Sequence, residues 1–332
     1  MRNIRRLLLI CCMPWLFFSA CDVHEWPEIP ELVTCNLSLA YNTEMTEWGH
    51  LYDDTKVVEQ GFGTTYNNHR EQGVIRYIVR TYPLTENQRA LQSHAQEFVF
   101  TKDISQGYDH EVTLELLPGD YTLMVWSDLV ESDEEAHFYD ADNFVEIKLQ
   151  DKRHKSSDYR DAFCGQSNIS LPRNGAKLTE HTINVRMRRP MAKFEFVAND
   201  LLEFVAAKGS NLDQYKAKIL YVGYVPHTYG LFAGRPVAST MGVVVESSLT
   251  KLTESKVSMG FDYVFVSDNG SKVTVRIGIY DKNDKQVSLS DPITLPVKPD
   301  HHTVLEGKFL MLNASNGVYI DPNWGGDFNL TL

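Results

Sequence analysis

The chain has 332 residues, a formal net charge of −12 and a hydrophobic fraction of 43%. This length suits about two domains, each long enough to bury a core. The acidic balance argues against nucleic-acid binding, which needs a basic surface. Because the charge is spread along the chain, it favours solubility rather than marking a site.

The first 20 residues have the layout of an export signal. Residues 1–6 are short and basic, and residues 7–18 form an apolar run too short to span a bilayer. Two small residues then precede Cys21, a pattern that resembles a bacterial lipobox, in which a signal peptidase cuts before the cysteine and the thiol receives lipid. We therefore predict a lipoprotein with palmitate on Cys21, held at the outer membrane. A plain secretory signal that ends by chance at a cysteine is the alternative.

Residues 21–31 contain two prolines and four acidic residues. This composition favours an extended tether that lifts the rest of the protein off the membrane. Acidic residues close behind a lipidated cysteine also resemble the surface-export signal of Bacteroidetes lipoproteins. That resemblance implies display on the cell surface.

From residue 32 onward the pattern is mostly that of strands separated by turns. Residues 32–41 alternate, with Cys35, Leu37 and Leu39 on one face. Pro118-Gly-Asp predicts a tight turn that joins two neighbouring strands as a hairpin. The strands predicted in this part of the chain are 32–41, 74–82, 97–101, 112–117, 121–127, 144–149 and 182–187.

Arg188, Arg189 and Pro190 interrupt the strand pattern, and we place a domain boundary there. A short helix is predicted at 201–208, capped by Asn199 or Asp200 and stopped by glycine. Turn-separated strands indicate an antiparallel sandwich rather than parallel βαβ units. We predict an all-β protein with β-sandwich domains at 32–189 and 190–332. The later strands are predicted at 191–197, 217–222, 261–266, 272–280, 286–289, 293–297, 302–311 and 328–332.

Two cysteines, Cys35 and Cys164, remain after the signal and the lipidated residue are set aside. An oxidising compartment would allow one disulfide between them. Two buried free thiols are the other interpretation, and the sequence leaves both open.

Residues 132–143 gather five carboxylates, one histidine and one asparagine. Such a density of oxygen ligands suggests calcium. However, an EF-hand loop needs glycine at its sixth position and glutamate at its twelfth, and no register here supplies both. We therefore expect a solvated loop.

A second group of polar residues comprises His154, Asp158, Arg160 and Asp161. Catalysis would require a nucleophile and an oxyanion hole beside them, and neither can be assigned. We expect a salt-bridged crossover loop between strands. The chain also lacks zinc-type spacing, a phosphate loop, Gly-x-Ser-x-Gly and a dinucleotide fingerprint, so we predict neither enzymatic activity nor a cofactor.

Aromatic residues provide the remaining alternative. Trp48 with Tyr52, or Trp324, could stack on sugar rings, which would make the chain a surface glycan-binding lipoprotein. Aromatic residues in a sandwich are more often part of its core.

Several stretches together resemble the fimbrillin-type surface lipoproteins of Bacteroidetes, in particular their minor anchor or accessory subunits. One is a Pro-Gly turn followed by a tyrosine-containing strand that runs to Trp126. The resemblance implies two transthyretin-like Greek-key sandwiches. The stretches that carry it are the lipobox with its acidic tether, 117–128, 158–163, 187–196, and 293–297 with 304–310.

The resemblance also implies a mechanism. Stalk subunits of this family are cut by an arginine-specific protease in the first strand, and a neighbour's strand then fills the groove. Anchor subunits escape the cut. Here the first arginine after Cys21 is Arg70, and Lys56 is the only earlier basic residue. We therefore predict a subunit that keeps its lipid and contacts other fimbrial subunits or surface proteins through strands, with 328–332 among its partner-binding parts.

Overall fold

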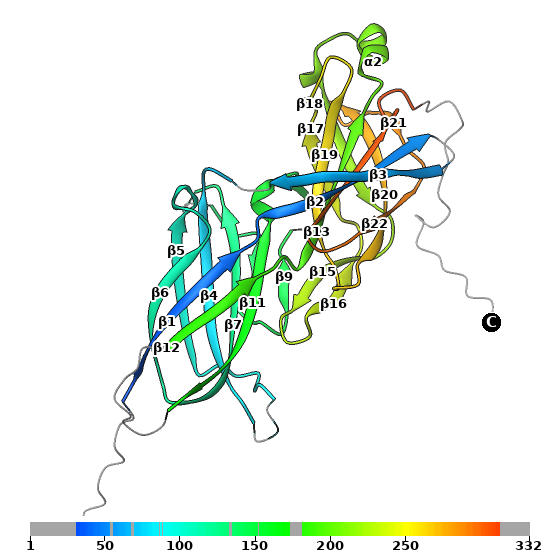
Figure 1. Ribbon diagram of the computed structural model, residues 1–332. Coiled ribbons are helices and arrows are strands. Elements are labelled where there is room, and N and C mark those ends of the chain that lie inside the picture. Colours follow the sequence, from blue (N-terminus) through cyan, green and yellow to red (C-terminus); the bar gives the residue numbers. More distant parts are fainter. Residues whose placement is uncertain are drawn as a thin grey trace, which may run out of the picture.

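The computed structural model of the chain (Figure 1) describes residues 31–53, 56–67, 70–85, 87, 89–132, 135–151, 153–172 and 181–312. Strands form most of this part of the chain, and its only α-helix is α2, Leu201–Lys208. The strands build several packed sheets, so the all-β prediction is confirmed.

The first sandwich packs a three-stranded sheet against a four-stranded sheet. β1 is the central strand of the smaller sheet, and its alternation buries Cys35, Leu37 and Leu39 as predicted. The smaller sheet has the order β12-β1-β6, with bounds His181–Met187, Val33–Tyr41 and His110–Leu116. The larger has the order β11-β7-β4-β5, with bounds Ala162–Leu171, Gly119–Val130, Val74–Pro83 and Gln96–Asp103.

The second sandwich is larger and encloses its own core. One sheet has the order β10-β17-β14-β20-β21, with β22 also paired to β20; the bounds are Arg153–Lys155, Val244–Ser248, Tyr215–Tyr221, Ser271–Asp281, Gln286–Leu289 and Ile293–Val297. The other has the order β18-β19-β13-β23-β2-β3, with bounds Thr250–Lys251, Val257–Phe265, Met191–Ala198, His301–Gly307, Glu44–Asp53 and Lys56–Asn67. Phenylalanine and branched aliphatic side chains from both sheets fill the space between them.

A third core joins the two sandwiches. The sheet of β4 and β7 is buried on both faces: Leu123 points into the first sandwich, and its neighbour Met124 points into the third core. Trp126 is fully buried there and contacts Tyr139 and Phe265 edge-on or tilted. A small sheet of order β16-β15-β9-β8 contributes to the same core; its bounds are Arg235–Thr240, Val225–Gly230, Ile147–Leu149 and Tyr139–Asp140.

The chain passes between the two sandwiches more than once. β1 belongs to the first sandwich, whereas β2 and β3 extend the sheet of the second sandwich beside β23. In Figure 1 the chain passes from β1 in the lower lobe to β2 and β3 in the upper lobe. β10 likewise pairs with β17 of the second sandwich. Strands that precede residue 189 thus pair with strands that follow residue 190. The division of the sequence into two domains at this point stays a prediction.

The predicted hairpin at Pro118 is wrong. β6 pairs with β1, whereas β7 pairs with β4 and β11, so the turn connects opposite sheets. Leu114 of β6 and Leu123 of β7 therefore enter one core from its two opposite sheets. Gly119 at the turn has φ +152°, and a Cβ atom there would lie 2.8 Å from the hydroxyl of Tyr121.

Several other local expectations have mixed outcomes. Helix α2 forms over the predicted residues and is followed by Gly209, but the Asp200 side chain makes no capping bond. Its carboxylate instead accepts hydrogen bonds from the backbone amides of Leu310 (3.3 Å) and Met311 (2.9 Å). The expected antiparallel pattern dominates, but β1·β12, β2·β23, β13·β23 and β10·β17 are parallel pairs.

Cys35 and Cys164 are free and buried, so the disulfide alternative is wrong. Burial raises the pKa of Cys35 to about 11 and that of Cys164 to about 12, which keeps both side chains as thiols.

Among the described helices, none has the length and apolar character of a membrane span.

The two buried faces of β7 give a direct test. Leu123→Ala and Met124→Ala should each lower the free energy of unfolding by about 2–5 kcal/mol, because each removes buried methylene groups from a different core. Denaturant titration measures both. Glu111→Ala, at an exposed position of β6, is the control, with a change below about 0.5 kcal/mol. A silent Met124→Ala would show that only one face of the sheet is buried.

Candidate functional site: the polar junction between the sandwiches

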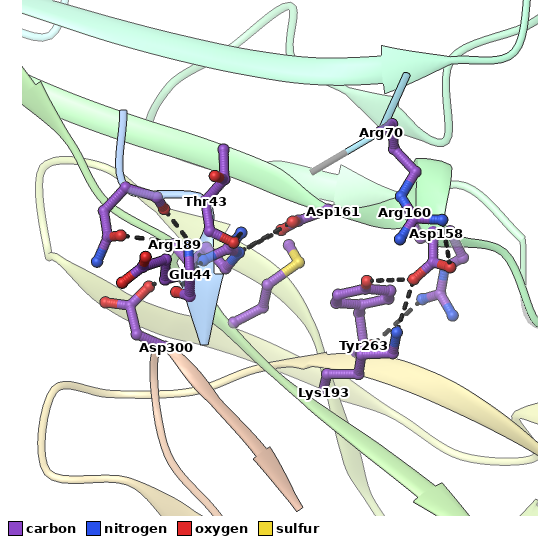
Figure 2. Close-up of polar contacts among 12 residues, drawn as sticks. Thr43, Glu44, Arg70, Asp158, Arg160, Asp161, Arg189, Lys193, Tyr263 and Asp300 are labelled. Carbon is purple, nitrogen blue, oxygen red and sulfur yellow. Dashed lines mark hydrogen bonds and ion pairs between the residues drawn. The ribbon is translucent and has the colours of Figure 1, made fainter. Parts of the chain in front are cut away.

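Buried charged residues concentrate where the two sandwiches meet. The short 3-10 helix η3, Asp158–Arg160, supplies some of them, and Asp161 follows directly. The segment that joins β12 to β13 supplies Arg189. Figure 2 shows two groups side by side, one around Arg189 and one around Asp158.

Arg189 holds the chain where it crosses from β1 to β2. Its Nε donates to both carboxylate oxygens of Asp161 at 2.9 Å. Nη2 donates to the carbonyl oxygen of Thr43 at 2.8 Å, and Nη1 donates to the carbonyls of Asn42 at 3.1 Å and Glu44 at 3.0 Å. Three consecutive carbonyls therefore share one guanidinium, an arrangement we term the Arg189 clasp.

The chemistry of the clasp requires arginine. The guanidinium presents five N–H donors in a fixed planar fork, whereas lysine offers a single charged centre. Burial acts to lower the pKa of Arg189, but the Asp161 carboxylate outweighs it and holds the pKa above its ordinary value. The ring of Phe163 covers one face of the guanidinium at 4.7 Å. Arg189 thus stays charged although its side chain is fully buried.

The second group centres on Asp158. Its carboxylate accepts from Lys193 Nζ at 2.7 Å and from the Tyr263 hydroxyl at 2.8 Å, both from the second sandwich, and pairs with Arg70 at 3.0 Å. The buried Lys193 ammonium also lies 4.1 Å from the ring centre of Phe261. Burial raises the pKa of Asp158, but the Lys193 charge and hydrogen bond outweigh it, and the net shift is downward.

Arg160 completes the junction from the other side of η3. It pairs with the Asp262 carboxylate, which also accepts from the Tyr221 hydroxyl at 2.7 Å. His154 Nε2 lies 3.2 Å from the same carboxylate. Burial, followed by the charge of Arg160, lowers the pKa of His154 to about 2, so this histidine is neutral at physiological pH.

The structure therefore brings together all four polar residues that the sequence singled out. His154, Asp158, Arg160 and Asp161 each reach a partner in the second sandwich or in the segment leading to it. The expected salt bridges are confirmed, but the segment is not simply a loop, because it contains the short strand β10 and the 3-10 helix η3. Sequence reasoning missed Arg189, Lys193 and Asp262. The Arg-Arg-Pro run was a visible signal, but we interpreted it only as a boundary.

The acidic stretch at 132–143 is only partly the solvated loop that we expected. Tyr139 and Asp140 form β8, and Tyr139 and Ala141 are buried. Residues 133–134 lie outside the described part. Across the described ranges, His, Cys, Asp and Glu side chains form no group of three or more suited to a metal ion.

Two of the proposed sugar-stacking residues have ring partners within the protein. Trp48 is half-buried and lies against His50, and Tyr52 stacks on Phe309 at 5.2 Å between ring centres. Four predictions lie outside the described residues, the second of them except for its last residue, and stay predictions: the signal peptide with Cys21, the tether at 21–31, the role of Trp324, and the strand at 328–332.

The chain belongs to the DUF6562 family, a family of unknown function whose model matches residues 30–332. No curated protein matches it. Solved structures that are similar in fold include the fimbrial anchor protein Mfa2 from Porphyromonas gingivalis, with 11% identity, a TM-score of 0.36, and 77% of this chain and 82% of that chain covered. A fimbrial assembly protein from Parabacteroides distasonis has 10% identity and a TM-score of 0.36, with 86% of this chain and 93% of that chain covered. These are distant likenesses.

The Arg189 clasp predicts a contrast between neighbouring arginines. Arg189→Met should destabilise the protein by about 3–5 kcal/mol, because it leaves the buried Asp161 carboxylate without its partner. Arg188→Met should cost at most about 1 kcal/mol, because Arg188 pairs with Asp268 at the surface. Denaturant unfolding measures both. Adding Asp161→Leu to Arg189→Met should recover part of the lost free energy of unfolding. If the effects of the two substitutions on that free energy simply add, the two residues are not a coupled pair.

Asp158 predicts a specific pH dependence. A carboxyl whose pKa is lower in the folded than in the unfolded chain stabilises the fold above the unfolded pKa of about 3.9, and the contribution is lost as pH falls through the folded value. The stability difference between wild type and Asp158→Asn should therefore be largest near pH 7 and shrink below about pH 4. Thermal or denaturant unfolding across this range tests it. Asp268→Asn, at an exposed pair, should give a much smaller difference at pH 7.

Proposed function

We propose that this chain is a lipid-anchored protein of the outer membrane, displayed on the cell surface, that serves as a fimbrium anchor or accessory subunit. Its role is assembly and adhesion through strand-mediated contacts with other fimbrial subunits or surface proteins, without enzymatic activity. The proposal rests on the lipobox that ends at Cys21, on the motif set described above and on the all-β fold.

The observation that carries the anchor role is the position of β1. The proposed tether leads directly into this strand, which lies between β12 and β6 and pairs with both over seven residues. Cys35, Leu37 and Leu39 of β1 are almost completely buried. Removal of β1 would open the core of the first sandwich, yet the chain has no arginine from Cys21 to His69 at which an arginine-specific protease could remove it. The strand and its lipid would then stay together.

An open sheet edge supports the strand-mediated contacts. Among the described strands β16 pairs only with β15, so within this part of the chain its outer side offers backbone groups for pairing. Exposed apolar side chains lie on and next to this edge: Val237 and Met241 are about half exposed, and Tyr224 is 77% exposed. An extended segment from a partner would find both ladder bonds and apolar contacts there.

The glycan-binding alternative gains no support from its proposed residues in the described part. Trp48 and Tyr52 contact other rings of the second sandwich rather than presenting a flat exposed platform. We therefore retain the fimbrial role as the proposal.

The lipid anchor has a direct test in the native organism. Wild type should incorporate labelled palmitate, and its mature N-terminus should begin at Cys21 by mass spectrometry. Cys21→Ala should abolish labelling and release the protein from the membrane fraction, because the acyl chains that would hold the protein in the membrane are attached at this cysteine. Cys12→Ala, within the apolar run, is the matched control and should label normally. A surface form whose sequence starts beyond β1 would contradict the anchor role.

A further inference from the structure

β1 and β2 form one extended path through the molecule. β1 ends at Tyr41 in the first sandwich and β2 begins at Glu44 in the second, so only two residues of backbone separate them. Figure 1 shows β1 leading into β2 across the junction, with the start of β1 at the end of the lower lobe. All other strands of the first sandwich come after residue 70 and lie off this path.

An extended strand cannot lengthen appreciably under tension. A strand already rises about 3.3 Å per residue, close to the 3.3–3.6 Å limit of the backbone. Tension applied at the start of β1 therefore passes along covalent bonds to β2. The remaining strands of the first sandwich lie beside this covalent path and pair with it only through β12 and β6.

The path ends in a pair of parallel strands. β2 pairs with β23 over seven residues, from Thr46 opposite His301 to Tyr52 opposite Gly307. Tension at the N-terminal end of β2 and at the C-terminal end of β23 acts on opposite ends of this ladder. It therefore loads all the hydrogen bonds in shear at once, whereas tension at the same end would open them one after another.

We propose that β1 and β2 are the load-bearing path of this protein, and that β2·β23 is its mechanical clamp. The inference rests on the proposed function, because this tension arises only if the membrane holds the N-terminal end and a partner pulls on the chain after β23, where the sequence predicts the partner-binding strand 328–332. Under that load the chain transmits force without unfolding the first sandwich.

The Arg189 clasp protects the start of the clamp. It holds the carbonyls of Asn42, Thr43 and Glu44, immediately before the first ladder pair at Thr46. Asp161 fixes the guanidinium from the other side. For β2 to slide, these charge-assisted hydrogen bonds must break together with the ladder. Met45 and His50 of β2 are also buried and resist the same movement.

Single-molecule force spectroscopy tests the clamp by changing only one attachment point. We use the full mature chain with Cys21→Ala and a common handle at Lys308→Cys, just after β23. The second handle is at Asn42→Cys, between β1 and β2, which shears β2 against β23 without pulling on the ladders of β1, or at Asp53→Cys, which unzips the same pair. The native thiols of Cys35 and Cys164 are buried and do not compete for the handles.

The 42/308 geometry should break at a force at least about twice that of 53/308, because seven ladder pairs resist together instead of in turn. Equal forces in the two geometries would overturn the proposal. With the shear handles, Arg189→Met should lower the rupture force, and Arg188→Met should leave it unchanged. An unchanged force in folded Arg189→Met would remove the clasp from the proposal.

The clamp can be tested separately from the Arg189 clasp and from the anchor role. If Arg189→Met does not fold, the comparison of the two wild-type geometries still decides whether β2·β23 is a shear clamp. The force measurement uses isolated protein, so its outcome does not depend on lipidation. Failure of palmitate labelling at Cys21 would contradict the anchor role and remove the source of the load, whereas equal rupture forces would contradict the clamp and leave the anchor role intact.

Discussion

The interaction on which the structure most depends is the buried contact of Arg189 with Asp161 and the carbonyls of residues 42–44. Wherever an extended chain leaves one sheet and enters another, its carbonyls lose their ladder partners, and buried carbonyls without partners are costly. One guanidinium supplies donors to three of them. Its charge in turn requires Asp161, which fixes the end of η3. With η3 fixed in this way, Asp158 and Arg160 lie beside their partners in the second sandwich.

The apolar counterpart of this junction is the third core. A sheet that buries both faces cannot shift relative to one neighbour without disturbing the other, because protein interiors are close-packed. Trp126, with Tyr139 and Phe265 around it, joins side chains from the first sandwich, the small sheet and the second sandwich. The two sandwiches are therefore held together by a core that both of them build.

The sequence was informative wherever burial was local and periodic. β1, β4, β7 and β20 have β-branched or alternating apolar residues and were found within a few residues of their bounds. β2 and β3 were not found, because Glu44–Asp53 mixes charged, aromatic and small residues and gains its place by pairing with β23 near the other end of the chain. The Pro118 turn was assigned to a hairpin because turn chemistry alone does not say whether the strands join one sheet or two. The polar residues of η3 were noticed, but their partners at Lys193 and Asp262 depend on tertiary contacts that no local spacing encodes.

The parallel pairing of β2 with β23 also has a consequence for how the chain folds. β2 is among the first strands to be synthesised, and the strand that completes its sheet on that side is the last one described. Contacts between such distant parts of a chain form slowly, since a long loop must close before any of them is made. The second sandwich therefore cannot be finished in the order of synthesis, and the edge of β2 stays open until residues 301–307 have emerged. Until then it is a place where another chain can pair wrongly.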